Sequence, residues 1–125
     1  VVTDDGTEHH GQGAIHAGWV LAGRALQDVW ILPGVFHGTT LRVYDPARRD
    51  WRIQWSDPLR LYFACQRGRA VGADIVQLGA NDTGEWTRWS FSAIACDHFT
   101  WRGEVATPGG GWRLNAEFAC RRRVA

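Results

Sequence analysis

Apolar and polar residues alternate with a period of two along most of the chain. The pattern is clearest near the C-terminal end, where one parity carries Trp112, Leu114, Ala116, Phe118 and Cys120. Such alternation is typical of a β-strand with one buried face, and turn-forming residues separate the successive runs. No stretch of the sequence shows apolar residues at helical spacing. The sequence therefore predicts an all-β protein with eight or nine short antiparallel strands.

The last two runs predict a hairpin whose register suits both faces. A four-residue turn over residues 108–111 places Trp101 opposite Phe118 and Arg102 opposite Glu117. The first pair buries apolar surface, and the second joins opposite charges on a solvated face. We therefore expect this register, with a surface role for the charged pair.

A second hairpin is predicted on either side of an Asp-Pro turn. A five-residue loop would place Val43 opposite Ile53 and Leu41 opposite Trp55, so that these four residues form the apolar face. Arg42 would then lie on the polar face.

Strands that follow one another in this way can close by rolling into an up-and-down barrel, with residues 1–125 as a single domain. The interior of an eight-stranded barrel holds packed side chains or one small ligand. No apolar run approaches the roughly 18 residues of a membrane-spanning helix, and the N-terminal Val-Val-Thr-Asp-Asp lacks the features of a signal peptide. We expect a soluble, cytoplasmic protein with no membrane partner.

Charge and cysteine content argue against several classes of function. The 14 basic residues, all arginine, and 13 acidic residues leave a net charge of +1, and the basic block is confined to residues 121–123. Nucleic acid is therefore not an expected partner, and the absence of lysine excludes Schiff-base chemistry. The 3 cysteines match no zinc or redox spacing, so we expect reduced structural thiols.

The stretch "ALQDVWI", residues 25–31, breaks the alternation rule because each of its faces mixes apolar with polar side chains. Burying a polar group without partners costs a few kcal/mol, so the polar side chain that faces the interior needs a hydrogen-bond partner or a functional role. We favour Gln27 as the inward group. The alternative turns Asp28 and Trp30 inward, with Arg42 as the counter-ion.

The apolar parity of the strands carries many aromatic side chains, which either fill the barrel or leave a cavity for a small apolar or aromatic molecule. The predicted ligand-binding residues are Trp19, Gln27, Asp28, Trp30, Arg42, Trp55, Phe63, Trp89, Phe91, Trp101 and Leu114.

Histidines offer an alternative to a simple binding cavity. Glu8, His10 and His16 share one parity and would suit a metal or haem site, but their spacing is not diagnostic, and exposed histidines are the preferred interpretation. His37 and His98 fall in predicted loops without a recognised nucleophile motif. We therefore assign no catalytic residue, no metal ligand and no cofactor.

Several separated stretches resemble a known family. "GWVLAGRALQDVW", "GTTLRVYDPARRDWRIQW" and "WRLNAEF" are similar to the uncharacterised lipocalin-like proteins of bacteria, which are small calycin-type β-barrels. The resemblance extends from about residue 13 to residue 121.

The resemblance implies a barrel with a central cavity and, for most members of the family, no assigned function. Calycin relatives mostly carry small hydrophobic molecules, and some bind haem through a histidine. The motif positions include Asp28, Trp30, Arg42 and Tyr44, which strengthens the case for Asp28 as the polar anchor of the cavity and leaves Asp28 and Gln27, each with Arg42, as the two candidates.

The leading hypothesis is that the barrel binds a small hydrophobic or aromatic ligand. One alternative is an isomerase or cyclase that uses Asp28 or a histidine as an acid or base inside an apolar pocket. Others are a haem-binding calycin and a filled barrel whose exposed sheet edge forms a homodimer.

Overall fold

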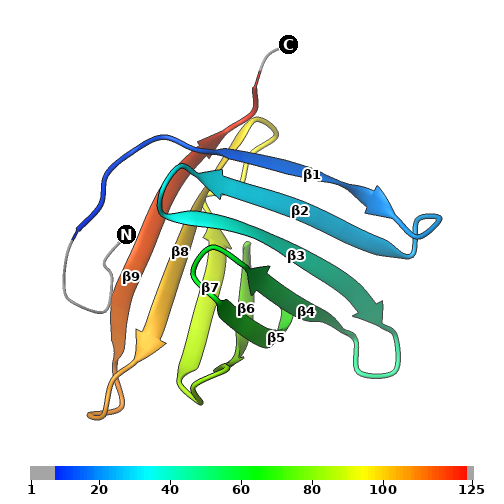
Figure 1. The fold of residues 1–125 in the computed structure, drawn as a ribbon. Helices are drawn as coiled ribbons and strands as arrows, with labels where there is room; N and C mark the ends of the chain where they lie inside the picture. The colour runs from blue at the N-terminus through cyan, green and yellow to red at the C-terminus, as the bar shows by residue number, and fades with distance from the viewer. Residues whose placement is uncertain (1–7, 124–125) are drawn as a thin grey trace.

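The computed structural model describes residues 8–123, which form nine strands in a single antiparallel sheet (Figure 1). The strands are β1 (Ala14–Val20), β2 (Ala25–Leu32), β3 (Phe36–Asp45), β4 (Asp50–Asp57), β5 (Tyr62–Val71), β6 (Asp74–Asn81), β7 (Trp86–Ser92), β8 (His98–Ala106) and β9 (Trp112–Arg121). Each strand pairs with the next one along the chain. The prediction of an all-β protein with eight or nine strands is confirmed.

The sheet is strongly curled and has the shape of half a barrel (Figure 1). Its two edges are β1 and β9, and within residues 8–123 no strand ladder joins them. The same part of the chain contains no helix that is long and apolar enough to cross a membrane.

Aromatic side chains pack on the concave face of the sheet, which we define as the face that carries Asp28, Trp30 and Trp55. The buried core there consists of Trp30, Trp55, Ala64, Trp101 and Ala116. Two glycines make room for indole rings. A Cβ atom at Gly38 would lie 2.4 Å from Trp55 Cη2, and one at Gly103 would lie 2.6 Å from Trp101 Cη2. These positions therefore accept no larger side chain without moving a core tryptophan.

The C-terminal hairpin has the predicted strand register from His98 to Gly103. Trp101 pairs with Phe118 on the concave face, and Arg102 pairs with Glu117 on the convex face, where Arg102 Nε lies 3.1 Å from Glu117 Oε2. Both side chains of this ion pair are about half exposed. The expected register and the surface role of the charged pair are confirmed.

The turn of this hairpin differs from the prediction. Ala106 pairs with Trp112 across a five-residue loop, and the register then shifts between Gly103 and Glu104. Such a bulge reverses the parity of the bulged strand. Leu114, opposite Glu104, consequently lies on the convex face and is 40% exposed.

The β3–β4 register is shifted by one residue from the predicted one. Arg42 pairs with Ile53, and Leu41 pairs with Gln54. Four residues, 46–49, join the strands, and Arg49 adopts a left-handed φ of 55° that tightens the turn. Because a one-residue slip moves every side chain to the other face, Arg42 lies on the concave face and Leu41 on the convex face. The predicted apolar partnership of Leu41 with Trp55 is therefore wrong.

Strand β5 places Phe63, one of the predicted ligand-binding residues, on the face opposite to the expected one. It begins at Tyr62, after Leu61 with a left-handed φ of 51°, and it buries Ala64 and Gln66 on the concave face. Phe63 points to the convex side and is 43% exposed. The expected inward position of Phe63 is wrong. The turn at Leu61 directs the even-numbered residues of β5, such as Ala64, to the concave face, so Phe63 points the other way.

Candidate functional site

Two hollows lie along the concave face, and the larger one also takes in convex-face residues near the sheet edges, such as Glu117. The larger hollow has a volume of about 1210 Å³ and extends from the start of β1 to the end of β9. The smaller hollow has a volume of about 50 Å³ and lies among the core aromatic rings. Trp30, Phe36, Arg42 and Phe118 line both. Arg42 therefore stands where the two spaces meet.

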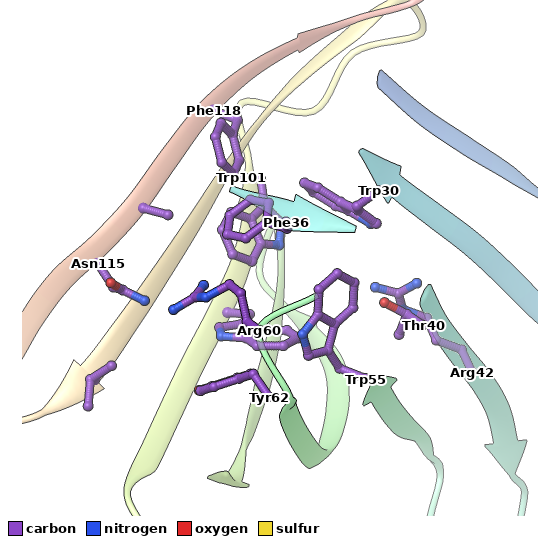
Figure 2. Close-up of a pocket in the computed structure, with 13 residues that line it drawn as sticks. Trp30, Phe36, Thr40, Arg42, Trp55, Arg60, Tyr62, Trp101, Asn115 and Phe118 are labelled. Atoms are coloured by element: carbon purple, nitrogen blue, oxygen red, sulfur yellow. The ribbon is translucent and has the colours of Figure 1, made fainter. Parts of the chain in front are cut away.

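Aromatic rings nearly fill the smaller hollow (Figure 2). The Trp101 ring lies 5.2 Å from that of Trp30, 5.7 Å from that of Trp89 and 5.6 Å from that of Phe118, measured between centroids. Trp89 in turn meets the edge of Trp55 at 5.9 Å. Such contacts stabilise the core beyond the area they bury. In this half of the interior, the filled-core interpretation holds.

The turn between β4 and β5 closes one side of the smaller hollow. The Arg60 guanidinium lies over the rings of Phe36 and Tyr62, with its Cζ atom 5.7 Å and 5.5 Å from their centroids (Figure 2). Asn81 Nδ2 donates a hydrogen bond to the Tyr62 hydroxyl at 3.2 Å. Burial raises the pKa of Tyr62, because the phenolate form would be poorly solvated there.

A chain of polar side chains crosses the concave face between strands that are distant in the sequence. Arg42 Nη1 donates to Asp28 Oδ2 at 2.5 Å, and Arg42 Nε donates to Gln77 Oε1 at 3.1 Å. Gln77 Nε2 donates to Gln66 Oε1 at 3.0 Å, and Gln66 Nε2 donates to the Thr87 hydroxyl at 2.8 Å. The chain thus links β2 and β3 to β5, β6 and β7.

The far end of this polar chain is fully satisfied. The Thr87 hydroxyl donates to the Gly79 carbonyl at 2.9 Å, and Gln66, Gln77 and Thr87 are all at most 4% exposed. Each amide uses its oxygen as an acceptor and its nitrogen as a donor in the chain. Because Gln77, Gln66 and Thr87 all have hydrogen-bond partners, this network is rigid and holds the Arg42 guanidinium in one orientation.

The near end of the chain is not satisfied. Asp28 is 5% exposed, and its Oδ1 atom has no hydrogen-bond partner among the described residues, although it is buried and the residue lines the larger hollow. A buried acceptor without a donor costs about 1–3 kcal/mol. Such a group needs an explanation, and one explanation is a ligand.

Asp57 provides an internal comparison, because its Oδ2 atom is also buried without a partner. Its Oδ1 atom accepts hydrogen bonds from the amides of Leu59 and Arg60, which fixes the β4–β5 turn. Asp57 lines neither hollow. Its local role is therefore structural.

The structure brings most of the predicted site residues together on the concave face. Trp30, Trp55, Trp89 and Trp101 surround the smaller hollow, Asp28 and Phe91 line the larger one, and Arg42 lines both. The alternative in which Asp28 and Trp30 turn inward with Arg42 as counter-ion describes the observed arrangement.

Four predicted residues lie elsewhere. The preference for an inward Gln27 is wrong: this side chain is on the other face of β2 from the buried Asp28 and donates to the Thr39 hydroxyl at 3.2 Å. Trp19, on edge strand β1, is 64% exposed and lines neither hollow. Phe63 and Leu114 lie on the convex face, for the reasons of register given above.

Sequence reasoning missed Gln66, Gln77 and Thr87. A glutamine in a strand ordinarily belongs to the solvated face, and Gln77 alternates with Val76 and Leu78, which look like the buried parity. The signal in the sequence is Gly79, two residues after Gln77 along the strand. In the structure Gly79 pairs with both Gln66 and Thr87, and a Cβ atom there would lie 2.0 Å from the Cys65 carbonyl oxygen. A position that accepts only glycine marks a close approach inside the sheet.

The histidines are not gathered into a site. His10 Nε2 lies 3.8 Å from Glu8 Oε2 with both side chains exposed, and residues 8–123 contain no group of three or more side chains able to hold a metal ion. His37 and His98 belong to strands β3 and β8 rather than to loops. His98 Nδ1 lies 2.7 Å from Asp97 Oδ1, and this hydrogen bond lowers the pKa of Asp97.

The chain matches no protein-family model and no curated protein sequence. The class of protein is therefore defined by fold and site alone. It is an all-β protein, a curled nine-stranded antiparallel meander with a buried ion pair on its concave face.

Proposed function

We propose that this protein binds a small apolar or aromatic molecule in the larger hollow of its curled sheet. The observation that carries the proposal is the Asp28–Arg42 ion pair, whose side chains are only 6% and 11% exposed and which lines that hollow. A buried ion pair is poor evidence for a stabilising role, since apolar residues of the same volume often stabilise a protein equally well. Ligand pockets, in contrast, use a few polar groups to orient what they bind.

The walls of the larger hollow suit such a ligand. Around the ion pair it is lined by the apolar side chains of Leu26, Trp51, Ile53, Ile75 and Phe91. Its volume of about 1210 Å³ exceeds what a single small molecule requires, so the ligand would enter without rearrangement of the sheet.

The proposal includes a calycin-type barrel and a cytoplasmic location. The curled meander of sequential strands supports the first; a closed barrel would require β1 and β9 to pair, and within residues 8–123 no strand ladder joins them. The free thiols of Cys65 and Cys96, both exposed, support a reducing compartment. A homodimer formed through an open sheet edge stays a prediction.

Binding can be tested with N-phenyl-1-naphthylamine, an uncharged aromatic probe whose fluorescence rises in apolar surroundings. We expect saturable binding with one probe per chain. Ile75 lines the larger hollow and pairs with Phe91, so Ile75→Trp should weaken binding at least tenfold by placing a larger ring beside Phe91, where the ligand would lie. The matched control is Leu78→Trp on the same strand, where the side chain is 43% exposed and lines neither hollow.

Native mass spectrometry of protein purified from its own host would complete this test. A stoichiometric small-molecule adduct that is lost on denaturation would support the proposal. A rise in probe fluorescence that does not saturate, or that Leu78→Trp and Ile75→Trp affect equally, would overturn it.

A further inference from the structure

We infer that the ligand carries an uncharged hydroxyl group, which donates a hydrogen bond to Asp28 Oδ1 and accepts one from the Arg42 guanidinium. The inference rests on the proposed function and names the chemistry of the ligand at the same site. The class it points to is an aromatic alcohol, such as a phenol.

The free oxygen of Asp28 sets the first requirement. Oδ2 is engaged by Arg42 Nη1 at 2.5 Å, while Oδ1 is buried without a donor and belongs to a residue that lines the larger hollow. A carboxylate oxygen only accepts hydrogen bonds. The group that meets Oδ1 must therefore bring an O–H or N–H.

The guanidinium of Arg42 sets the second requirement. It has five N–H donors, of which Nε serves Gln77 and Nη1 serves Asp28. Arg42 also lines the larger hollow, adjacent to Asp28. A ligand atom placed at Asp28 Oδ1 would therefore also lie near a free N–H group of Arg42. A hydroxyl group suits this position because it can donate a hydrogen bond to Oδ1 and accept one from Arg42.

Charge sets the third requirement. Asp28 and Arg42 already neutralise each other, and the polar side chains next in the chain, Gln77 and Gln66, are neutral amides. A carboxylate would add a second negative charge beside Asp28, and an ammonium would add a second positive charge beside Arg42. An uncompensated charge in a buried site is costly, so an uncharged head group is favoured.

The surroundings of the ion pair favour an aromatic ligand. The Arg42 Cζ atom lies 5.6 Å from the centroid of the Phe91 ring, which also lines the larger hollow. A planar ring attached to the hydroxyl group would extend along Phe91 in an offset or edge contact.

The test compares three probes on the full chain by displacement of N-phenyl-1-naphthylamine: 2-naphthol, naphthalene and 2-naphthoate. They share one ring system and differ in the head group. We expect 2-naphthol to bind roughly ten- to a hundredfold more tightly than naphthalene, as for a hydrogen bond to a charged group. We expect 2-naphthoate to bind more weakly than 2-naphthol.

Asp28→Asn should reduce the preference for 2-naphthol over naphthalene to less than threefold, because a neutral amide oxygen accepts a weaker hydrogen bond than a carboxylate oxygen does. Asp57→Asn is the matched control, because Asp57 is an equally buried aspartate with one unpartnered oxygen that lines neither hollow. It should keep the full preference. The ranking of the probes on the unaltered chain tests the inference even if a variant does not fold.

The outcomes separate this inference from the proposed function. Equal affinity for 2-naphthol and naphthalene would overturn the inference that the ligand carries a hydroxyl group, but the proposed binding function would stand. Tightest binding of 2-naphthoate would also overturn it, in favour of an anion held by Arg42. Failure of N-phenyl-1-naphthylamine and of all three naphthalene probes to bind would overturn the proposed function itself.

Discussion

Replacing Arg42 by methionine should lower the free energy of unfolding far more than the same replacement at an exposed arginine that also forms an ion pair. Methionine retains most of the length of the side chain, so packing is disturbed little. The change leaves the Asp28 carboxylate in a site where only 6% of its side chain reaches solvent. Removing one partner of a buried ion pair costs about 3–5 kcal/mol in free energy of unfolding.

Arg102→Met is the matched control. Arg102 forms an ion pair with Glu117 across two neighbouring strands, but the two side chains are 47% and 51% exposed. Exposed pairs of this kind contribute about 0–1 kcal/mol. Urea unfolding followed by the fluorescence of the 8 tryptophans gives the free energy of unfolding for both variants.

The double variant Asp28→Leu with Arg42→Met separates charge from packing. It removes both charges, so it should be more stable than Arg42→Met by about 2 kcal/mol or more. Gln77 loses its hydrogen-bond donor in both variants, so that loss cancels in the comparison. If Arg42→Met cost no more than Arg102→Met, or if the double variant were the less stable one, the ion pair would not be a desolvated pair and the reasoning would fail.

Two titrations test the burial of single groups. Burial raises the pKa of Tyr62, so in Tyr44→Phe, which leaves one of the 2 tyrosines, absorbance at about 295 nm should show ionisation above the ordinary value near 10. Because the folded state holds its proton longer than the unfolded state, the free energy of unfolding should fall as pH rises above that value, and a midpoint at or below 10 would contradict this. Burial also raises the pKa of the half-buried Cys120 thiol, so iodoacetamide should modify the exposed Cys65 and Cys96 first at pH 8, as peptide mapping would show; equal rates at all three would contradict it.

The sequence determined which segments are strands and, where both faces agreed, how they pair. In the C-terminal hairpin one register placed Trp101 with Phe118 and Arg102 with Glu117, and any slip would have broken both pairs at once. The period-two pattern with turn residues between the runs was likewise enough to predict an antiparallel meander of eight or nine strands, and the structure has nine.

The candidate site was predictable only as a set of alternatives. Residues 25–31 showed that a polar group would be buried, and Asp28 with Arg42 was one of the two arrangements considered. Nothing in the local pattern decided between Gln27 and Asp28, because both faces of β2 mix apolar with polar residues. Gln77 was not predictable as a buried group, since its partner Arg42 lies 35 positions away along the chain.

The tertiary structure decided which face of each strand became the inside. A four-residue turn in place of five moved Arg42 inward, and a bulge near Gly103 moved Leu114 outward. Alternation defines two faces of a strand, but turn length and curl determine which one is concave. The candidate site forms because the curl brings Arg42, which is paired with Asp28, against Gln77 on a distant strand. This contact cannot be read from the residue pattern of any single strand.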